Sequence, residues 1–149
     1  MTDSLQFSQS LRKWVDTFTH RSMRDSARFV KNHGFSMPQL FLLMRVYKHE
    51  HCNISDLSDD LEITSSAVSQ LVDKLVQTGM LTRKEDSNDR RVKKVELSPA
   101  GSAFIEQGFK ERYRWVDELA DALSDEEERK IAEALQILDH VMIRTETEE

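Results

Sequence analysis

The side chains best suited to bind another molecule lie in a basic segment, residues 81–101, LTRKEDSNDRRVKKVELSPAG. Residues 82–85 and 92–97 carry strand-type side chains in rough alternation, and the sequence between them is turn-forming. This pattern predicts a β-hairpin with Arg90 and Arg91 at its tip. Beside a helix-turn-helix, a basic hairpin of this kind is a device for holding double-stranded DNA.

A helix-turn-helix pattern directly precedes the hairpin, because residues 54–81 read ISDLSDDLEITSSAVSQLVDKLVQTGML. Ser55 is expected to cap a short helix, Thr64 to cap a second helix, and Gly79 to end it. Two short helices about a tight turn, the second beginning with small polar residues, form the helix-turn-helix arrangement.

The sequence before this motif predicts two further helices. Apolar spacing favours a long first helix over residues 5–32, ended by Gly34. Ser36 and Pro38 open a second helix. Residues 49–53 are expected to break it, with a polar loop at residues 49–52.

The sequence after the hairpin predicts two more helices. Ser98 and Pro99 open one of them, which is expected to run to about residue 123. Ser124 with Glu127 three residues later is a capping box that opens the last helix. That helix carries apolar residues at spacings of four, three and four, namely Ile131, Leu135, Leu138 and Met142.

The expected fold is mainly α with a small β-hairpin wing, a winged helix-turn-helix domain with N- and C-terminal dimerisation helices. One domain would span residues 1–149, with the DNA-binding lobe at 36–97 and the dimerisation helices at 5–32 and 98–144. Heptad-like stripes on terminal helices are more often core than interface. A single module reads few base pairs, however, and symmetric dimers that read two half-sites are the usual remedy. We therefore expect a homodimer.

Composition is compatible with this fold, although the net charge of −6 first argues against a nucleic-acid partner. The charge is unevenly distributed: residues 82–95 hold six basic and three acidic side chains, whereas residues 98–149 hold six basic and fourteen acidic ones. Local charge decides where a polyanion docks. The chain opens with neither a basic start nor an apolar stretch and has no membrane-length apolar run, which predicts a cytoplasmic protein without membrane association.

These residues resemble the MarR-type winged helix-turn-helix transcription regulators. The family signature has an Asp-x-Arg wing that leads into a strand, then Leu-Thr-x-x-Gly at the next helix. Here the matching residues are Asp89-Arg90-Arg91, Val95, and Leu97 to Gly101 with serine in place of threonine. Residues 66–75, SAVSQLVDKL, resemble the family's recognition helix.

The resemblance implies a homodimer joined through the terminal helices, which binds a palindromic duplex near a promoter and generally represses transcription. Many members release DNA when a small, often phenolic, ligand or an oxidant acts on the dimer. This chain departs from the family at Gln70, where arginine is common, and at Ala67, where threonine is common. Half-site preference therefore cannot be carried over from a relative.

The start of the second helix of the motif is expected to face the major groove, where Gln70 can pair bidentately with adenine. The wing arginines suit a narrow minor groove, with Arg91 the better candidate, although one of them can instead pair with Asp89 or Asp73 to brace the wing. The candidate DNA-binding residues are Thr64, Ser65, Ser66, Ser69, Gln70, Lys74, Arg83, Asn88, Arg90, Arg91 and Lys93.

An effector pocket for a small aromatic or phenolic ligand is expected between the first, second and fifth helices. Its candidate lining residues, each of which could equally fill core, are Phe18, Met23, Phe41, Tyr113 and Trp115. We predict no cofactor and no metal site, because the ligand types at residues 49–52 are adjacent in sequence and no second cluster accompanies them.

Two alternatives to a ligand-released DNA regulator remain open. The single cysteine, Cys52, can serve as an oxidant sensor if nearby histidines lower its pKa. The other alternative is a winged-helix module that binds another protein through its acidic C-terminal half. An enzyme is not expected, because the sequence holds no glycine-rich phosphate loop and no nucleophile elbow.

Overall fold

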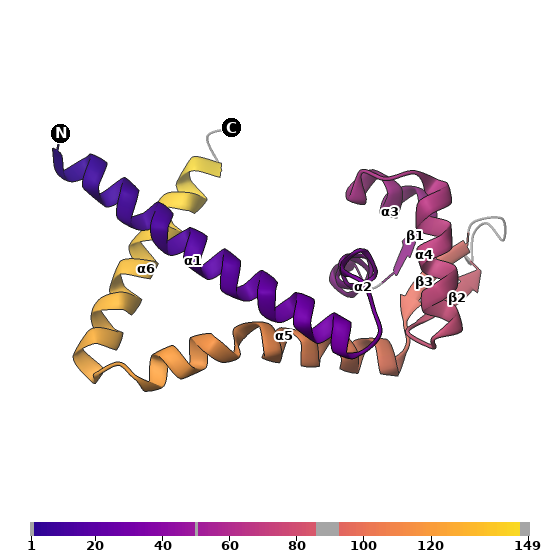
Figure 1. Cartoon of the computed structure of the whole chain (residues 1–149). Coiled ribbons are helices and arrows are strands. Elements are labelled where there is room, and N and C mark those ends of the chain that lie inside the picture. The colour runs from indigo at the N-terminus through magenta and orange to yellow at the C-terminus, as the bar shows by residue number, and fades with distance from the viewer. Residues whose placement is uncertain (1, 50, 86–92, 147–149) are drawn as a thin grey trace. The chain divides into compact units, whose positions relative to one another are not determined.

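The computed structural model describes residues 2–49, 51–85 and 93–146. The elements follow in the order α1 (Thr2–Asn32), α2 (Met37–His49), β1 (His51–Asn53), α3 (Ile54–Leu61), α4 (Ser65–Gln77), β2 (Leu81–Glu85), β3 (Lys93–Leu97), α5 (Pro99–Asp121) and α6 (Asp125–Glu146) (Figure 1). The chain divides within α5 into two compact units, Met1–Arg112 and Tyr113–Glu149. The expected fold class, mainly α with a small β wing, is confirmed.

The three strands form one antiparallel sheet in the order β1-β3-β2. The predicted hairpin is confirmed, with Leu81 opposite Leu97 and Arg83 opposite Val95. Its predicted tip, which includes Asn88, Arg90 and Arg91, lies outside the described residues.

The prediction of a polar loop at residues 49–52 is wrong, because α2 continues to His49 and β1 begins at His51. Cys52 of β1 pairs with Val95 of β3, and the two side chains are buried at 5% and 1% exposure. A strand of three residues is too short for its alternation to show in a sequence.

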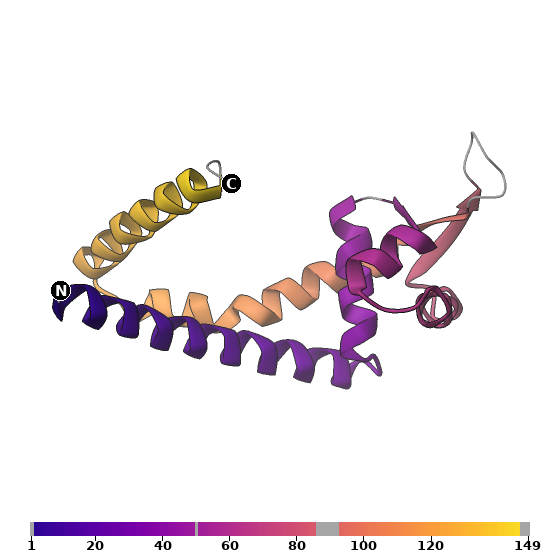
Figure 2. The ribbon, with the colours of Figure 1, turned by 90° about the horizontal axis from the view of Figure 1, so that it is seen from above.

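In the first unit, each element of the winged helix-turn-helix packs one of its faces into the hydrophobic core. In α4, Val68, Val72 and Leu75 follow the 3.6-residue period of a helix and are fully buried. They pack in one hydrophobic cluster with residues of α2, α3, the sheet and α5, and Figure 2 shows α4 end-on beside the hairpin. Burial of one face of α4 leaves its opposite face to solvent.

Each helix of the helix-turn-helix motif begins at a side-chain cap. The predicted cap Ser55 is wrong for α3, because Asn53 precedes the helix and its side-chain oxygen accepts the N–H of Asp56 at 2.8 Å. Asn53 also ends β1, so the capping residue depends on a strand that the sequence did not reveal. Thr64 caps α4 as predicted and accepts the N–H of Ala67 at 3.2 Å.

A group of hydrogen bonds joins the end of α4 to the start of α5. The hydroxyl of Ser98 donates to the carbonyl of Gly79 and accepts the N–H of Gly101 at 2.9 Å. The N–H of Ser98 donates to the carbonyl of Met80 at 3.0 Å. A side-chain Cβ at Gly101 would lie 2.1 Å from that Met80 oxygen, so glycine is required for this close approach.

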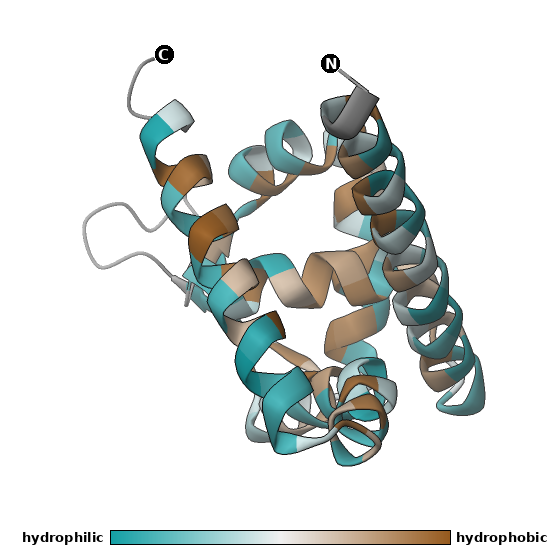
Figure 3. Ribbon diagram, turned by 90° about the vertical axis from the view of Figure 1, so that its left-hand side faces the viewer, coloured by the Kyte–Doolittle hydropathy of each residue, from teal (hydrophilic) through white to brown (hydrophobic). Residues whose placement is uncertain are grey.

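In the second unit, the predicted capping box opens α6. The N–H of Ser124 donates to Glu127 Oε2 at 2.9 Å, and the hydroxyl of Ser124 donates to the same oxygen at 2.7 Å. Apolar side chains recur along the helix, as the brown segments of α6 show in Figure 3. Most of them are exposed: Ile131, Leu135, Ile137, Val141, Met142 and Ile143.

Over residues 2–49, 51–85 and 93–146, no helix combines the length and apolar character needed to cross a membrane.

Candidate nucleic-acid interface

The first turns of α4 present a polar surface opposite the buried face of the helix. Ser65, Ser66 and Gln70 are exposed, and Ser69 is half-buried. The hydroxyl of Ser65 lies 3.3 Å from that of Ser58 in α3, so this serine also ties the two helices of the motif together. Small side chains at the start of a helix let its backbone and the longer Gln70 approach a base edge closely.

Lys74 continues this surface one turn after Gln70 and is exposed. An ammonium at this place suits a DNA phosphate. Among the other predicted contacts, the Thr64 side chain is exposed while it caps the helix. The Lys93 side chain and the three wing-tip residues Asn88, Arg90 and Arg91 fall outside what the structure describes.

Arg83 is exposed on β2, but its guanidinium is paired with the carboxylate of Asp73 on α4. From the sequence, pairing of Arg90 or Arg91 with Asp89 or Asp73 was an alternative to DNA contact by that arginine. The described partner is instead Arg83, ten residues after Asp73. The pairing of Asp73 with Arg83 was not predicted from the sequence.

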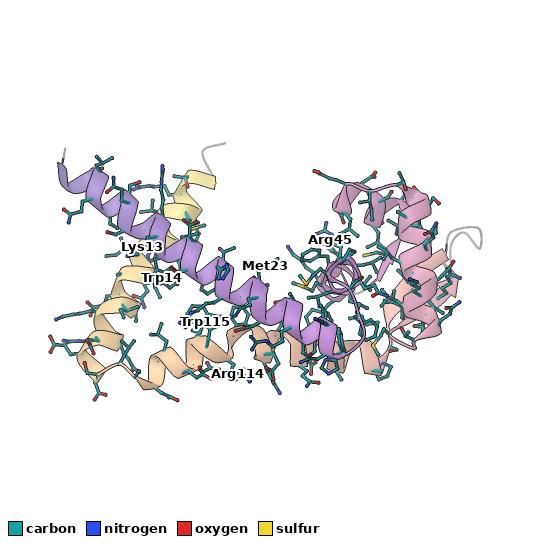
Figure 4. The ribbon with its side chains drawn as sticks, in the orientation of Figure 1. Lys13, Trp14, Met23, Arg45, Arg114 and Trp115 are labelled. Atoms are coloured by element: carbon teal, nitrogen blue, oxygen red, sulfur yellow. The ribbon has the colours of Figure 1, made fainter. Side chains whose placement is uncertain are left out.

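Beside the motif, Arg45 of α2, labelled in Figure 4, pairs with Asp60 of α3. The hydrogen bond from Arg45 holds the pKa of Asp60 below its ordinary value of 3.8. This pair links the helix that supports the motif to the first helix of the motif.

Cys52 does not have the environment of a reactive thiol. Burial is the main cause that raises its pKa above the ordinary value, and the nearby carboxylate of Asp56 raises it further. Since the thiolate is the reactive form, a raised pKa disfavours the oxidant-sensing alternative. Within the residues that the structure describes, no cluster of three or more histidine, cysteine or acidic side chains could hold a metal ion.

A small cavity in the first unit lies between α1, α2 and α5, where the effector pocket was expected. Its volume is about 10 Å³, room for roughly one water molecule. None of the five predicted residues lines it; the lining side chains are Ser26, Leu40, Met44, Ile105, Phe109 and Arg112, with Gly108.

The five predicted pocket residues have different surroundings. Phe18 stacks on Trp14 with ring centroids 5.4 Å apart, and Met23, labelled on α1 in Figure 4, lines a separate open cavity of about 590 Å³. Phe41 and Tyr113 are exposed at 42% and 40%, whereas Trp115 is buried.

The fold and the exposed face of α4 together define a winged helix-turn-helix protein. Comparison with known proteins agrees. The model of the MarR family matches residues 35–93. The uncharacterized HTH-type transcriptional regulator YwhA of Bacillus subtilis (strain 168) is 30% identical over 89 residues, which cover 60% of this chain and 64% of that protein. The match thus spans a little less than two thirds of that relative.

Solved structures share the fold. The transcriptional regulator Tm0710 from Thermotoga maritima superimposes with a TM-score of 0.86 at 24% identity, and the match covers 95% of this chain and 99% of that chain. A mutant of MepR from S. aureus, solved bound to an oligodeoxyribonucleotide, superimposes with a TM-score of 0.72 at 19% identity. That match covers 89% of this chain and 97% of the MepR chain.

Over residues 35–93 the chain is similar to the MarR family, and its relatives include proteins named HTH-type transcriptional regulators. These similarities indicate a DNA-binding transcription regulator as the class of protein.

Proposed function

We propose that this protein is a sequence-specific repressor that acts in the cytoplasm as a homodimer on a palindromic operator. The observation that carries the proposal is the polar, exposed face of α4 from Ser65 to Lys74, held outward by the burial of Val68, Val72 and Leu75. The MepR mutant, which shares the fold, is bound to an oligodeoxyribonucleotide in its structure, and this supports the same class of partner.

Within the lobe at residues 36–97, Gln70 would read a base and Lys74 would contact a phosphate. The small residues Thr64, Ser65, Ser66 and Ser69 would lie against base edges or the sugar-phosphate backbone. The hairpin would enter the minor groove with Asn88, Arg90 and Arg91 and approach phosphate with Lys93.

Dimerisation would use the terminal helices. In the first unit, α1 exposes Leu5, Phe7, Trp14 and Val15; in the second unit, α6 exposes a longer apolar series that includes Ile137 and Ile143. Large apolar side chains gathered on a surface helix indicate a protein-protein contact. A twofold axis between two copies would present two recognition helices to the two halves of a palindrome.

Release by a small aromatic or phenolic effector is the last part of the proposal. Its support is the apolar cavity between α1, α2 and α5, which lies beside helix α2 of the DNA-binding lobe. Because this cavity has a volume of only about 10 Å³, an effector would have to displace side chains such as Met44 or Phe109. Such a displacement would move α2, which packs against both α3 and α4.

The test is duplex binding as a function of salt. Purified protein is titrated by fluorescence anisotropy with a duplex selected from a random-sequence pool, at several KCl concentrations. A regulator that contacts several phosphates will show an affinity that falls steeply with salt, with a slope of about −0.9 per phosphate contacted. Lack of salt-dependent duplex affinity would favour the protein-binding module instead.

A further inference from the structure

Two ion pairs engage two cationic side chains of β2, Arg83 and Lys84. The guanidinium of Arg83 on β2 donates to the carboxylate of Asp73 on α4. Lys84, the next residue of β2, has its Nζ 2.6 Å from Glu96 Oε2 on β3. Each of these two cations is matched by a carboxylate, so together they add little net positive charge for attracting DNA.

Asp73 lies on the face of α4 that is proposed to read DNA, so the charge of its partner affects DNA binding. Asp73 follows Gln70 by three residues and directly precedes Lys74, and residues three or four apart share one face of a helix. Its side chain is 53% exposed. On a helix that enters the major groove, an unpaired carboxylate here would lie near the phosphates and be repelled by them.

The sheet register explains why Arg83 reaches this carboxylate. Arg83 lies directly opposite Val95, and directly opposed residues of an antiparallel pair project from the same face of the sheet. Val95 is 1% exposed and belongs to the hydrophobic core that also contains Val72 and Leu75 of α4. Arg83 is therefore on the face of the sheet that packs on α4, at the edge where its guanidinium meets Asp73.

We propose that Arg83 is a positioning residue for the DNA-reading helix and not a phosphate contact. Its guanidinium neutralises the carboxylate of Asp73 on the exposed face of α4 and fixes that helix to β2 of the hairpin. The inference rests on the proposed role of α4 in reading DNA and deepens it. It also changes the role expected for Arg83 from the sequence, which was that of a direct DNA contact.

A double-mutant cycle separates the two roles. The affinities of wild type, Arg83→Gln, Asp73→Asn and the double variant are measured by fluorescence anisotropy on the selected duplex. We expect Arg83→Gln to weaken binding roughly tenfold, within the range for loss of one nucleic-acid interaction. Asp73→Asn should restore affinity to within about threefold of wild type in the Arg83→Gln background but change it little on its own, because only the unpaired carboxylate repels DNA.

The conservative variant Arg83→Lys keeps the charge beside Asp73 and should bind within about threefold of wild type. A matched control is the cycle at Lys130 and Glu126, an exposed ion pair on α6 with Nζ and Oε1 2.6 Å apart. Lys130→Gln and Glu126→Gln remove one positive and one negative charge, as Arg83→Gln and Asp73→Asn do, and should leave duplex affinity unaltered. Both partners of the Asp73–Arg83 pair are exposed, and exposed pairs add little to stability, so circular dichroism should show all variants folded.

Additive effects, with Asp73→Asn improving binding equally in both backgrounds, would overturn the inference and make Arg83 a direct contact. Wild-type affinity for Arg83→Gln would also overturn it. Failure of the proposed function looks different: wild type itself would then show no salt-dependent affinity for any duplex, whereas failure of this inference alone leaves wild-type binding intact.

Discussion

At the scale of single residues, Gln70 is the side chain that we propose gives the DNA-reading helix a definite base preference. Its amide can donate to and accept from adenine in the major groove, whereas the neighbouring serines are permissive. We predict that Gln70→Ala changes the selected consensus more than the total affinity, with a cost of about 1–3 kcal/mol at the base it reads. Selection from a random duplex pool with both proteins checks this, and an unchanged consensus would remove the role.

Cys52 gives a second prediction at this scale. Its thiol is buried in β1 and its pKa is raised, so little thiolate is present near neutral pH to react with peroxide. Treatment of the wild type with hydrogen peroxide should leave duplex affinity unchanged, as should Cys52→Ser without treatment. Loss of binding in treated wild type, but not in treated Cys52→Ser, would restore the oxidant-sensing alternative.

At the scale of elements, the contact between Gly101 and Met80 holds the start of α5 against the end of α4. Gly101→Ala places a Cβ 2.1 Å from a backbone oxygen, so the backbone must shift, at a cost of about 1–3 kcal/mol. We expect a lower Tm by circular dichroism. The control is Gly108→Ala, whose Cβ would meet only the ring of Phe29 at 3.1 Å and should cost less. Equal losses for the two variants would contradict this account of the contact.

The cap of α6 gives a pH dependence. Hydrogen bonds from the Ser124 N–H and hydroxyl lower the pKa of Glu127 below its ordinary value of 4.5. A lowered pKa in the folded state means that the cap stabilises the protein above pH 4.5 and that this contribution is lost as the pH falls through the lower folded value.

Glu127→Gln should therefore reduce the fall in Tm between about pH 5 and pH 3. Glu133→Gln, in the middle of the same helix, is the matched control. A pH dependence identical in wild type and Glu127→Gln would show that the cap does not couple to folding.

Elements that depend on neighbouring residues in the sequence were predicted well, whereas elements that depend on contacts between distant residues were not. Thr64, the Ser124 capping box and the hairpin depend on neighbours in sequence, and all are confirmed. β1 was missed because a three-residue strand shows no period and forms only by pairing with β3, far later in the chain. The Asn53 cap was missed with it. The partner of Asp73 was also beyond prediction, since several arginines followed and only the sheet register selects Arg83.

At the scale of the whole molecule, the apolar side chains of α6 test the proposed dimer. Ile137 and Ile143 are 64% and 63% exposed. Large apolar side chains exposed together on one helix indicate a contact with another protein chain. We predict that the double variant Ile137→Glu and Ile143→Glu shifts the protein to monomers in sedimentation velocity at micromolar concentration. Gln136→Glu, a change to the same residue type at an adjacent polar position, should leave the dimer intact.

Persistence of the dimer in the double variant would exclude this part of α6 from the interface, and a monomeric wild type would contradict the dimer itself. The sequence alone could not decide this point, because a heptad-like stripe is the same whether it is covered by its own chain or by a second copy. The structure adds that three residues of that stripe, Ile131, Leu135 and Met142, are exposed, as are Ile137 and Ile143 beside it.

The most direct test of the central claim, that two copies of α4 read the two halves of a palindromic operator, is selection of bound duplexes from a random pool with the wild-type protein. We predict an enriched, twofold-symmetric consensus whose half-sites lie about 10 base pairs apart, centre to centre. Enrichment of an asymmetric single site, or of no sequence at all, would contradict it.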